Sequence, residues 1–303
     1  MKLATRDLLT VADLTPREFG GLVSRSITMK RRRTGRPLAG RTLAMIFEKP
    51  STRTRASFEA GMHQLGGHAI SLSSQETQLS RGESIEDTAR TLSRYSDCIM
   101  ARLYRHRSIE RLAAASSVPV INGLTDSFHP CQTLADFMTI RERLGRMDGL
   151  KIAWLGDGNN VCSSLIQGAA LAGSDVHVAC PRSMRPDAGV VREASRSVRV
   201  RMTEDPAEAA RGAHVVATDT HSSMHNKGVS RLSRLARYRV DARIMAGADP
   251  GAIFLHCLPA TRGREVSADV IDGPQSAVWD EAENRLHTQK ALLEALAGRP
   301  RAR

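Results

Sequence analysis

Aromatic residues, lysines and long apolar runs are all scarce in this sequence of 303 residues. Aromatics make up 4% of it and no RNA-recognition or zinc-finger pattern occurs, so the net charge of +12 does not indicate a nucleic-acid partner. No run approaches the roughly 18 apolar residues of a membrane helix. Met1 to Val11 also lacks the apolar stretch and cleavage site of a signal peptide. We therefore expect a cytoplasmic protein with no nucleic-acid or membrane partner.

Cysteine spacing excludes two further classes. The five cysteines are scattered along the chain without a CxxC pair, which favours reduced thiols over a disulfide framework. No cluster of histidine, cysteine and acidic residues has the spacing of metal ligands, so we expect no metal site. Glycines in Gly156–Val161 resemble the start of a dinucleotide fingerprint, but the third glycine is replaced by Val161. A nicotinamide cofactor is therefore disfavoured, and no cofactor is expected.

Composition is typical of a globular protein with a sizeable core. Hydrophobic residues make up 41% and charged residues 25% of the chain, whose length allows one large domain or two of ordinary size. Only six of the 44 basic residues are lysines, so the positive excess is arginine. The densest basic run, Lys30 to Arg33, falls at the end of a predicted helix, where cations complement the helix dipole. We interpret it as a solvated helix end in preference to a nucleic-acid patch.

Strands and helices alternate along the whole chain. Thr15-Pro16-Arg17-Glu18 predicts a capped helix start. Strands are predicted at 42–47, 68–72, 97–101, 118–121, 151–155, 175–179, 198–201, 214–218, 252–255 and 277–279, and helices at 15–30, 53–65, 109–115, 131–144, 161–172, 186–195, 206–211, 241–246 and 284–296, with a further helix that starts at Ser84. The alternation indicates an α/β fold with two doubly wound parallel-sheet domains and an interdomain cleft. We expect domains at 1–145 and 146–283, with 284–303 packing back on the first.

The stretch Phe47–Arg55 predicts a phosphate site. An apolar strand ends there in proline, hydroxyl residues and arginines that open a helix. Free backbone N–H groups and the positive dipole end attract anions at such a helix start. Ser51, Thr52 and Thr54 add hydroxyl donors, and Arg53 and Arg55 add forked guanidinium groups. The alternative is a capped helix with surface arginines.

Five further polar clusters follow predicted strand ends. They are Arg102, His129–Gln132, Asp157–Asn160, Asp219 and His256–Cys257. Ligands bind at the carboxyl edge of parallel sheets, so these clusters predict one site served by both domains. Taken singly, His129 is also compatible with a structural hydrogen bond, Asn160 with a helix cap and Cys257 with inert core. Arg102 is costly to bury without an anionic partner.

Several motifs together resemble those of the aspartate/ornithine carbamoyltransferase family, and of ornithine carbamoyltransferases within it. They are Ser51-Thr52-Arg53-Thr54-Arg55, His129-Pro130-Cys131-Gln132, Gly156-Asp157-Gly158-Asn159-Asn160, His256-Cys257-Leu258-Pro259 and Asp280-Glu281-Ala282-Glu283-Asn284-Arg285. The similarity runs from about Leu8 to Leu296 with the motifs in family order. The His-Cys-Leu-Pro motif distinguishes the ornithine enzymes from the aspartate enzymes.

The resemblance implies transfer of a carbamoyl group from carbamoyl phosphate to the δ-amine of L-ornithine, without a cofactor. It implies that Ser51, Thr52, Arg53, Thr54 and Arg102 hold the phosphate and that His129 and Gln132 bind the carbamoyl end. It assigns Asn160, Asp219, Ser223 and Met224 to ornithine, and Cys257, Leu258 and Arg285 to the reacting centre. Gln78 matches a position that reaches into a neighbouring subunit's site, which implies a homotrimer or a multiple of trimers.

One segment departs from the family pattern. The family has tryptophan where His221 stands and glycine where His225 stands, and the region between Arg182 and Asp219 is shorter here. The loop after Asp219 is expected to determine which second substrate binds. A carbamoyltransferase for another amine and a non-catalytic carbamoyl-phosphate-binding protein are the alternatives.

Overall fold

The computed structural model describes residues 3–32, 35–221 and 229–298. The chain divides into two compact units, one formed by Met1–Ala135 with Asn284–Arg303 and the other by Asp136–Glu283. We call them unit 1 and unit 2. The chain passes between them within two helices, α5 (Pro130–Leu144) and α12 (Val278–Ala297). No helix in the described part of the chain is long and apolar enough to cross a membrane.

Unit 1 is built on a four-stranded parallel sheet with the order β2-β1-β3-β4. Its strands are β1 (Thr42–Phe47), β2 (His68–Ser73), β3 (Cys98–Arg102) and β4 (Val120–Leu124), and its helices are α1 (Pro16–Arg31), α2 (Thr52–Gln64), α3 (Ile85–Tyr95) and α4 (His106–Ala115), with short 3-10 turns at Val11–Asp13, Ser74–Glu76 and Gln78–Arg81. The predicted start of α1 is confirmed: Thr15 accepts a hydrogen bond from the Glu18 backbone N–H, and the Glu18 carboxylate accepts one from Thr15.

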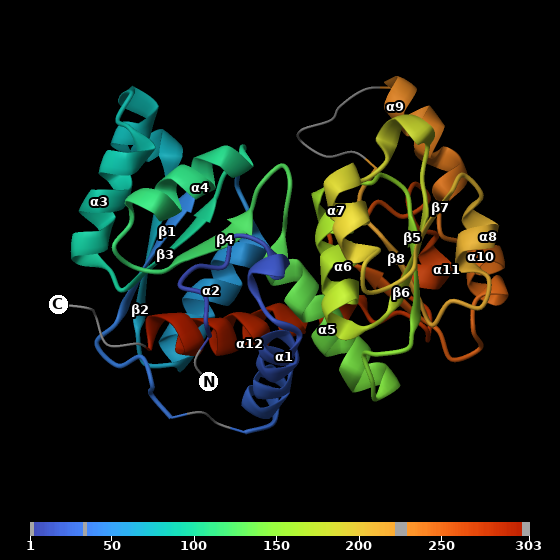
Figure 1. The fold of residues 1–303 in the computed structure, drawn as a ribbon, viewed down its shortest axis with the longest axis horizontal. Helices are drawn as coiled ribbons and strands as arrows, with labels where there is room; N and C mark the ends of the chain where they lie inside the picture. Colours follow the sequence, from blue (N-terminus) through green and yellow to red (C-terminus); the bar gives the residue numbers. More distant parts are fainter. Residues whose placement is uncertain (1–2, 33–34, 222–228, 299–303) are drawn as a thin grey trace. The chain divides into compact units, whose positions relative to one another are not determined.

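Helices cover both faces of this sheet, as Figure 1 shows. Ile85 and Ala89 of α3 and Ile109 and Leu112 of α4 pack in one buried cluster with strand residues such as Ile99. On α2, a side chain added at Gly61 would lie 3.3 Å from the Lys290 Cγ, so α2 and α12 run in close contact. Helices on both faces explain why the two central strands, β1 and β3, are buried and apolar over most of their length.

Unit 2 is built on a five-stranded parallel sheet with the order β7-β6-β5-β8-β9. Its strands are β5 (Lys151–Leu155), β6 (Asp175–Ala179), β7 (Val200–Thr203), β8 (Val215–Thr218) and β9 (Ile253–His256), and its helices are α6 (Asn160–Ala172), α7 (Ala188–Ala194), α8 (Pro206–Ala210), α9 (Val229–Leu235), α10 (Ala242–Gly247) and α11 (Ala268–Ile271), with 3-10 turns at Arg182–Met184 and Ala236–Tyr238. Two doubly wound parallel-sheet units are the fold class that the sequence predicts.

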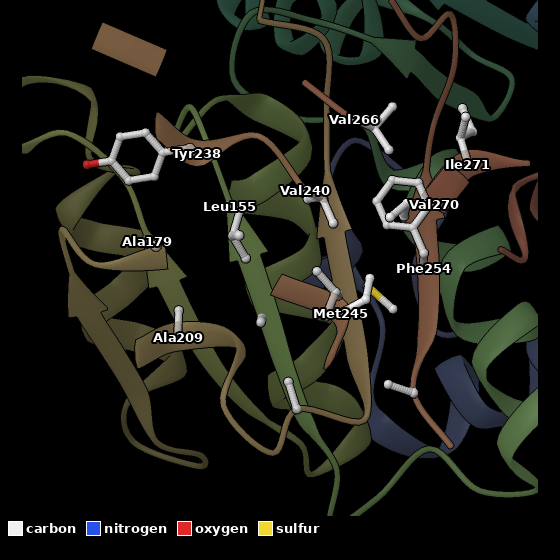
Figure 2. Packing of buried hydrophobic residues seen from close by; sticks show 14 of the residues in the cluster. Leu155, Ala179, Ala209, Tyr238, Val240, Met245, Phe254, Val266, Val270 and Ile271 are labelled. Atoms are coloured by element: carbon white, nitrogen blue, oxygen red, sulfur yellow. The ribbon is translucent and has the colours of Figure 1, made fainter. Parts of the chain in front are cut away.

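The core of unit 2 joins strand residues to the segments after α9. In Figure 2, Leu155 of β5 and Phe254 of β9 lie among Val240, Met245 and Val270. Phe254 and Val240 are fully buried. This packing fixes the ends of β5, β8 and β9, where the candidate site residues of this unit follow.

One predicted strand is wrong and two helices were not predicted. The segment 277–279 was expected to be a strand, but α12 begins at Val278, and Ala277 only donates one backbone hydrogen bond to Phe254. A run of three apolar residues does not distinguish a strand from a buried helix start. The short helices α9 and α11 have too few residues to show a helical period.

Candidate active site

Ser51 opens the phosphate motif as the N-cap of α2. Its backbone is extended, with φ −158° and ψ 108°, and its hydroxyl accepts a hydrogen bond from the Thr54 N–H at 3.3 Å. The N–H groups of the first helical turn have no partner within the helix, so they face outward with the positive dipole end. Thr54 is buried, whereas Thr52 and Arg53 are exposed. The motif thus presents donors at the carboxyl end of β1.

The two arginines of this motif differ. Arg55 forms an ion pair with Glu59 one turn further along α2, at 2.9 Å, on the exposed side of the helix. Arg53 has no ion pair with any described residue. Arg102 is paired with Phe47 in the register of the sheet, so its half-buried side chain starts from the same edge as the motif. Arg53 and Arg102 therefore follow or end strands at the same carboxyl edge of the sheet, whereas Arg55 is engaged by Glu59.

Arg285 joins three buried side chains that are far from it in sequence. Its Nη1 donates to the Gln132 Oε1 at 2.5 Å and lies 3.2 Å from the His129 Nε2, while its Nη2 lies 3.4 Å from the Thr54 hydroxyl. All four side chains are at most 5% exposed. We call Arg285, Gln132, His129 and Thr54 the Arg285 cluster. It brings the phosphate motif, the His-Pro-Cys-Gln motif and the final helix together within unit 1.

His129 is a neutral base in this cluster. Burial is the largest cause that holds its pKa well below the ordinary value, and the positive charges of Arg285 and Arg102 lower it further. A guanidinium has no acceptor, so the His129 Nε2 accepts from Arg285 and the ring proton is on Nδ1. The imidazole can therefore donate one hydrogen bond without carrying charge.

Lys49 is a candidate that the sequence reasoning missed. It is 3% exposed, and its ammonium lies 5.0 Å from the centre of the Tyr104 ring. Burial, followed by the charge of Arg102, lowers its pKa from 10.5 to about 8. The feature of the sequence that could have indicated it is the position of this lysine directly before Pro50 of the phosphate motif. The lowered pKa of Lys49 indicates an excess of positive charge in the region around Arg102.

Asp219 is the centre of the candidate residues in unit 2. It follows β8, and its Oδ1 accepts from the Cys257 Sγ at 3.0 Å and from the Thr220 N–H at 2.6 Å. Its Oδ2 accepts from the Asn159 Nδ2 at 2.7 Å. Asn159 also caps α6 through its Oδ1, so the cap role considered for Asn160 belongs mainly to its neighbour. Asn159, which sequence reasoning did not select, fixes the orientation of the carboxylate.

The Cys257 thiol is protonated. Desolvation raises its pKa well above the ordinary value, and the Asp219 carboxylate raises it further both by charge and by accepting the S–H hydrogen bond. The thiolate is the nucleophilic form of cysteine. Cys257 is therefore arranged as a hydrogen-bond donor to Asp219 and not as a nucleophile.

The loop after β9 holds an uncommon backbone conformation. Leu258 has φ 57°, and within the described ranges it is the only residue other than glycine with a positive φ. Its N–H donates to the His256 Nδ1 at 2.9 Å. The His256 Nε2 lies 3.6 Å from the Glu265 carboxylate, and both side chains are fully buried. A left-handed leucine persists only where surrounding contacts determine it, which is common at ligand sites.

His221 occupies the position where the family has tryptophan. It is 1% exposed, and neither ring nitrogen has a hydrogen-bond partner among the described residues. Burial lowers its pKa to about 4 despite the nearby carboxylates of Glu265 and Asp219. The ring also lies against Gly156, whose φ of 126° excludes most side chains. His221 is thus a neutral core residue beside Asp219.

The remaining expected residues fall outside these clusters. Asn160 is half-buried at the start of α6, and its Oδ1 accepts from the Val161 N–H at 3.1 Å. Gln78 is exposed in the 3-10 turn after β2. Ser223, Met224 and His225 lie outside the described residues.

Asp219, His256 and Cys257 place three potential metal-ligand atoms within 4.8 Å of one another. Sequence spacing did not reveal this group because the residues come from two strand ends. Hydrogen bonds engage these atoms, and a metal requires the thiolate, whereas the surroundings favour the thiol. The arrangement suits a hydrogen-bonded acid better than a cation.

Comparison with known proteins agrees with this geometry over nearly the whole chain. Residues 6–142 match the family described as "Aspartate/ornithine carbamoyltransferase, carbamoyl-P binding domain", and residues 148–296 match "Aspartate/ornithine carbamoyltransferase, Asp/Orn binding domain". A protein named ornithine carbamoyltransferase from Cenarchaeum symbiosum is 59% identical over 299 residues, which are 98% of this chain and 99% of that protein. Its namesake from Chromobacterium violaceum is 51% identical over 97% of both chains.

Solved structures show the same likeness. Ornithine carbamoyltransferase from Pyrococcus furiosus has a TM-score of 0.94 at 47% identity, with 98% of this chain and 99% of that chain covered. The structure from Thermus thermophilus has a TM-score of 0.90 at 42% identity, with 96% and 99% covered. These full-length matches show that the chain is an α/β transferase built on two parallel-sheet units. The chain belongs to the aspartate/ornithine carbamoyltransferase family.

Proposed function

We infer that the protein transfers the carbamoyl group of carbamoyl phosphate to the δ-amine of L-ornithine, giving L-citrulline and phosphate. The observation that carries this inference is the Arg285 cluster, in which residues from three family motifs meet within hydrogen-bond distance. The chain's likeness to proteins named ornithine carbamoyltransferase supports ornithine as the acceptor.

Unit 1 binds carbamoyl phosphate in this proposal. Ser51, Thr52, Arg53 and Thr54 hold the phosphate at the start of α2, and Arg102 bridges the phosphate and the carbonyl oxygen. The support is the capped helix start next to the carboxyl ends of β1 and β3. A dianionic group suits a site where buried bases already have lowered pKa values.

The carbamoyl carbon is attacked directly by the amine. Negative charge develops on the carbonyl oxygen, and Arg102, the Thr54 hydroxyl and the neutral His129 stabilise it as an oxyanion site. Gln132 and Arg285 hold the carbamoyl end and orient His129. The amine attacks in its neutral form, so an ammonium with an ordinary pKa of about 10 must first lose its proton.

Unit 2 binds ornithine. Asn160, Asp219, Ser223 and Met224 hold its amino-acid end, and the Asp219 carboxylate attracts the α-ammonium. Cys257 and Leu258 line the reacting centre, where the Cys257 S–H orients Asp219. Proximity and orientation supply the rate enhancement, without a covalent enzyme intermediate.

The assembly and organisation follow the same family pattern. Residues 1–145 form the carbamoyl-phosphate domain, residues 146–283 the ornithine domain, and residues 284–303 a terminal segment on the first domain. An exposed Gln78 is available to reach a neighbouring subunit's site in a homotrimer, or in a multiple of trimers. The protein works in the cytoplasm on small-molecule substrates, without a nucleic-acid partner.

A product assay tests the function. Purified protein is incubated with carbamoyl phosphate and a panel of amines that includes L-ornithine, L-lysine, putrescine and L-aspartate. We expect citrulline and phosphate in equal amounts with L-ornithine, and far slower turnover with the others. A ureido product with another amine alone would contradict ornithine as the acceptor. Tight carbamoyl-phosphate binding without any product would contradict catalysis.

A further inference from the structure

Unit 1 contains a second cationic site, separate from the phosphate motif. It is a cavity of about 850 Å³ lined by residues of α1, α2 and α12 and of the segment before β1. We call it the basic hollow; its lining residues are Met29, Lys30, Arg31, Arg32, Arg36, His63, Gln64, Gly66, Gly67, His287 and Lys290. Five of these are lysine or arginine and none is acidic. The volume lies in the range of small-molecule sites.

Lys290 is the most informative residue of the basic hollow. Its side chain is 4% exposed, and its ammonium donates to the Gln64 amide oxygen at 2.9 Å. It forms no ion pair with a described residue, and burial lowers its pKa. A buried ammonium with only a neutral acceptor costs free energy that an anionic ligand would recover.

The arginines of the hollow are also without carboxylate partners. Arg31, Arg32 and Arg36 are exposed, and none forms an ion pair within the described residues. Other arginines of unit 1, such as Arg25 with Glu294 and Arg41 with Asp97, do form ion pairs. Three arginines without an ion pair among the described residues thus gather at one cavity.

Helix dipoles do not account for this charge. The C-terminal ends of α1 and α2 are at the hollow, since Arg31 and Arg32 end the first helix and His63 and Gln64 the second. Each such end carries roughly half a negative elementary charge. Together they offset about one of the four full positive charges of Arg31, Arg32, Arg36 and Lys290. A substantial positive excess remains.

The hollow is distinct from the phosphate motif. Thr54 lies at the start of α2 and His63 near its end, nine residues later. At about 1.5 Å per residue, this separates the two positions by roughly 14 Å along the helix. Gly66 lets Arg36 lie against the backbone, since a Cβ added there would be 2.8 Å from the Arg36 Nε.

We propose that the basic hollow binds a small polyanion that carries at least two phosphate groups. The cations come from three separate segments around one cavity, so a ligand needs several anionic groups to engage them. Forked guanidinium groups at Arg31, Arg32 and Arg36 suit phosphate oxygens. Lys290 provides a point charge at the buried end.

Titration calorimetry with pyrophosphate, tripolyphosphate and magnesium-free ATP tests this site. The titrations use the full-length protein with Arg53→Ala, so that binding at the phosphate motif does not contribute. We expect at least one probe to bind this variant. Adding Arg31→Ala and Arg36→Ala should weaken that binding at least about tenfold, as expected when charge-assisted hydrogen bonds are lost. A preference for ATP over tripolyphosphate would identify a nucleotide as the source of the phosphates.

A matched control changes the same charge elsewhere. Arg94→Ala with Arg107→Ala removes two exposed arginines of unit 1 that do not line the hollow, and it should leave binding within about twofold. Lys290→Met, which retains the side-chain length, should weaken binding without lowering the thermal midpoint of the free protein. Equal weakening in both double variants, loss of all binding in Arg53→Ala alone, or binding only of an oligonucleotide would overturn the proposal.

Discussion

In unit 1 the buried bases His129 and Lys49 have lowered pKa values, and arginines contribute to both shifts. In unit 2 the buried acid Cys257 has a raised pKa, and Asp219 contributes to that shift. Positive charges near His129 and Lys49 thus favour the neutral forms of these bases, and the negative charge of Asp219 favours the neutral thiol of Cys257. An anion is the natural ligand of the first arrangement and an ammonium that of the second. The two substrates of a carbamoyltransferase have these two charges.

The largest loss of activity should come from replacing arginines of unit 1. Arg102→Ala, and likewise Arg53→Ala, should lower turnover by at least about 10²–10³, the usual cost of losing one oxyanion donor or its equivalent. The matched control is Arg55→Ala, because Arg55 is paired with Glu59 and should leave turnover near that of the wild type. Steady-state citrulline assays measure all three. Equal losses in Arg53→Ala and Arg55→Ala would remove the distinction drawn between the two arginines.

Asp219→Asn should have the next largest effect, and it should be confined to the second substrate. Loss of the carboxylate removes the charge that attracts an ammonium, so kcat/KM for ornithine should fall about 10²-fold, the scale of a lost charged hydrogen bond. Initial rates at saturating carbamoyl phosphate measure the change. The melting curve serves as the control, because Asn159 and Cys257 also bond to this side chain. An unchanged KM for ornithine would contradict the role of Asp219.

The pH dependence of stability should reveal the excess positive charge at Lys49. Its pKa in the folded protein is about 8, below the ordinary 10.5, so the unfolded chain binds more protons between these values. The free energy of unfolding should therefore rise from pH 8 to 10 relative to Lys49→Met, by on the order of 1–3 kcal/mol. Urea unfolding at several pH values tests this. Lys49→Arg, which stays charged, should lack the gain, and parallel curves for wild type and Lys49→Met would refute the shift.

Cys257→Ser should have the smallest effect on turnover. A serine hydroxyl retains a donor to Asp219, so we expect partial activity, within about tenfold of the wild type, because a neutral hydrogen bond contributes about 1 kcal/mol. The rate of citrulline formation measures it. Complete loss of activity in a folded variant would instead point to a covalent route through the sulfur.

Local sequence signals predicted the fold well where they were unambiguous. The Thr15–Glu18 capping box and the bounds of β5 and β6 were predicted as the structure has them. The segment 277–279 was wrong because its three apolar residues fit both a strand and a buried helix start. The motifs at Ser51, His129, Asp157 and His256 could be located by sequence, since each follows or ends a strand, whereas Arg285 lies within α12.

Contacts between distant segments could not be predicted by pattern alone. Arg285 meets Thr54 from 231 positions away, and only the family resemblance associated the two. Asn159 and Asn160 are adjacent residues of the same type, so sequence alone does not distinguish them, yet it is the Asn159 side chain that donates a hydrogen bond to Asp219. The burial of Lys49 beside Arg102 is likewise a property of packing, which no local pattern records.

The division of labour between the two units is tested most directly by measuring carbamoyl-phosphate binding and citrulline formation in the same two variants. Asp219→Asn should bind carbamoyl phosphate with the wild-type Kd in calorimetry yet form little citrulline, whereas Arg53→Ala should lose both. Wild-type carbamoyl-phosphate binding in Arg53→Ala, or its loss in Asp219→Asn, would contradict the assignment of one substrate to each unit.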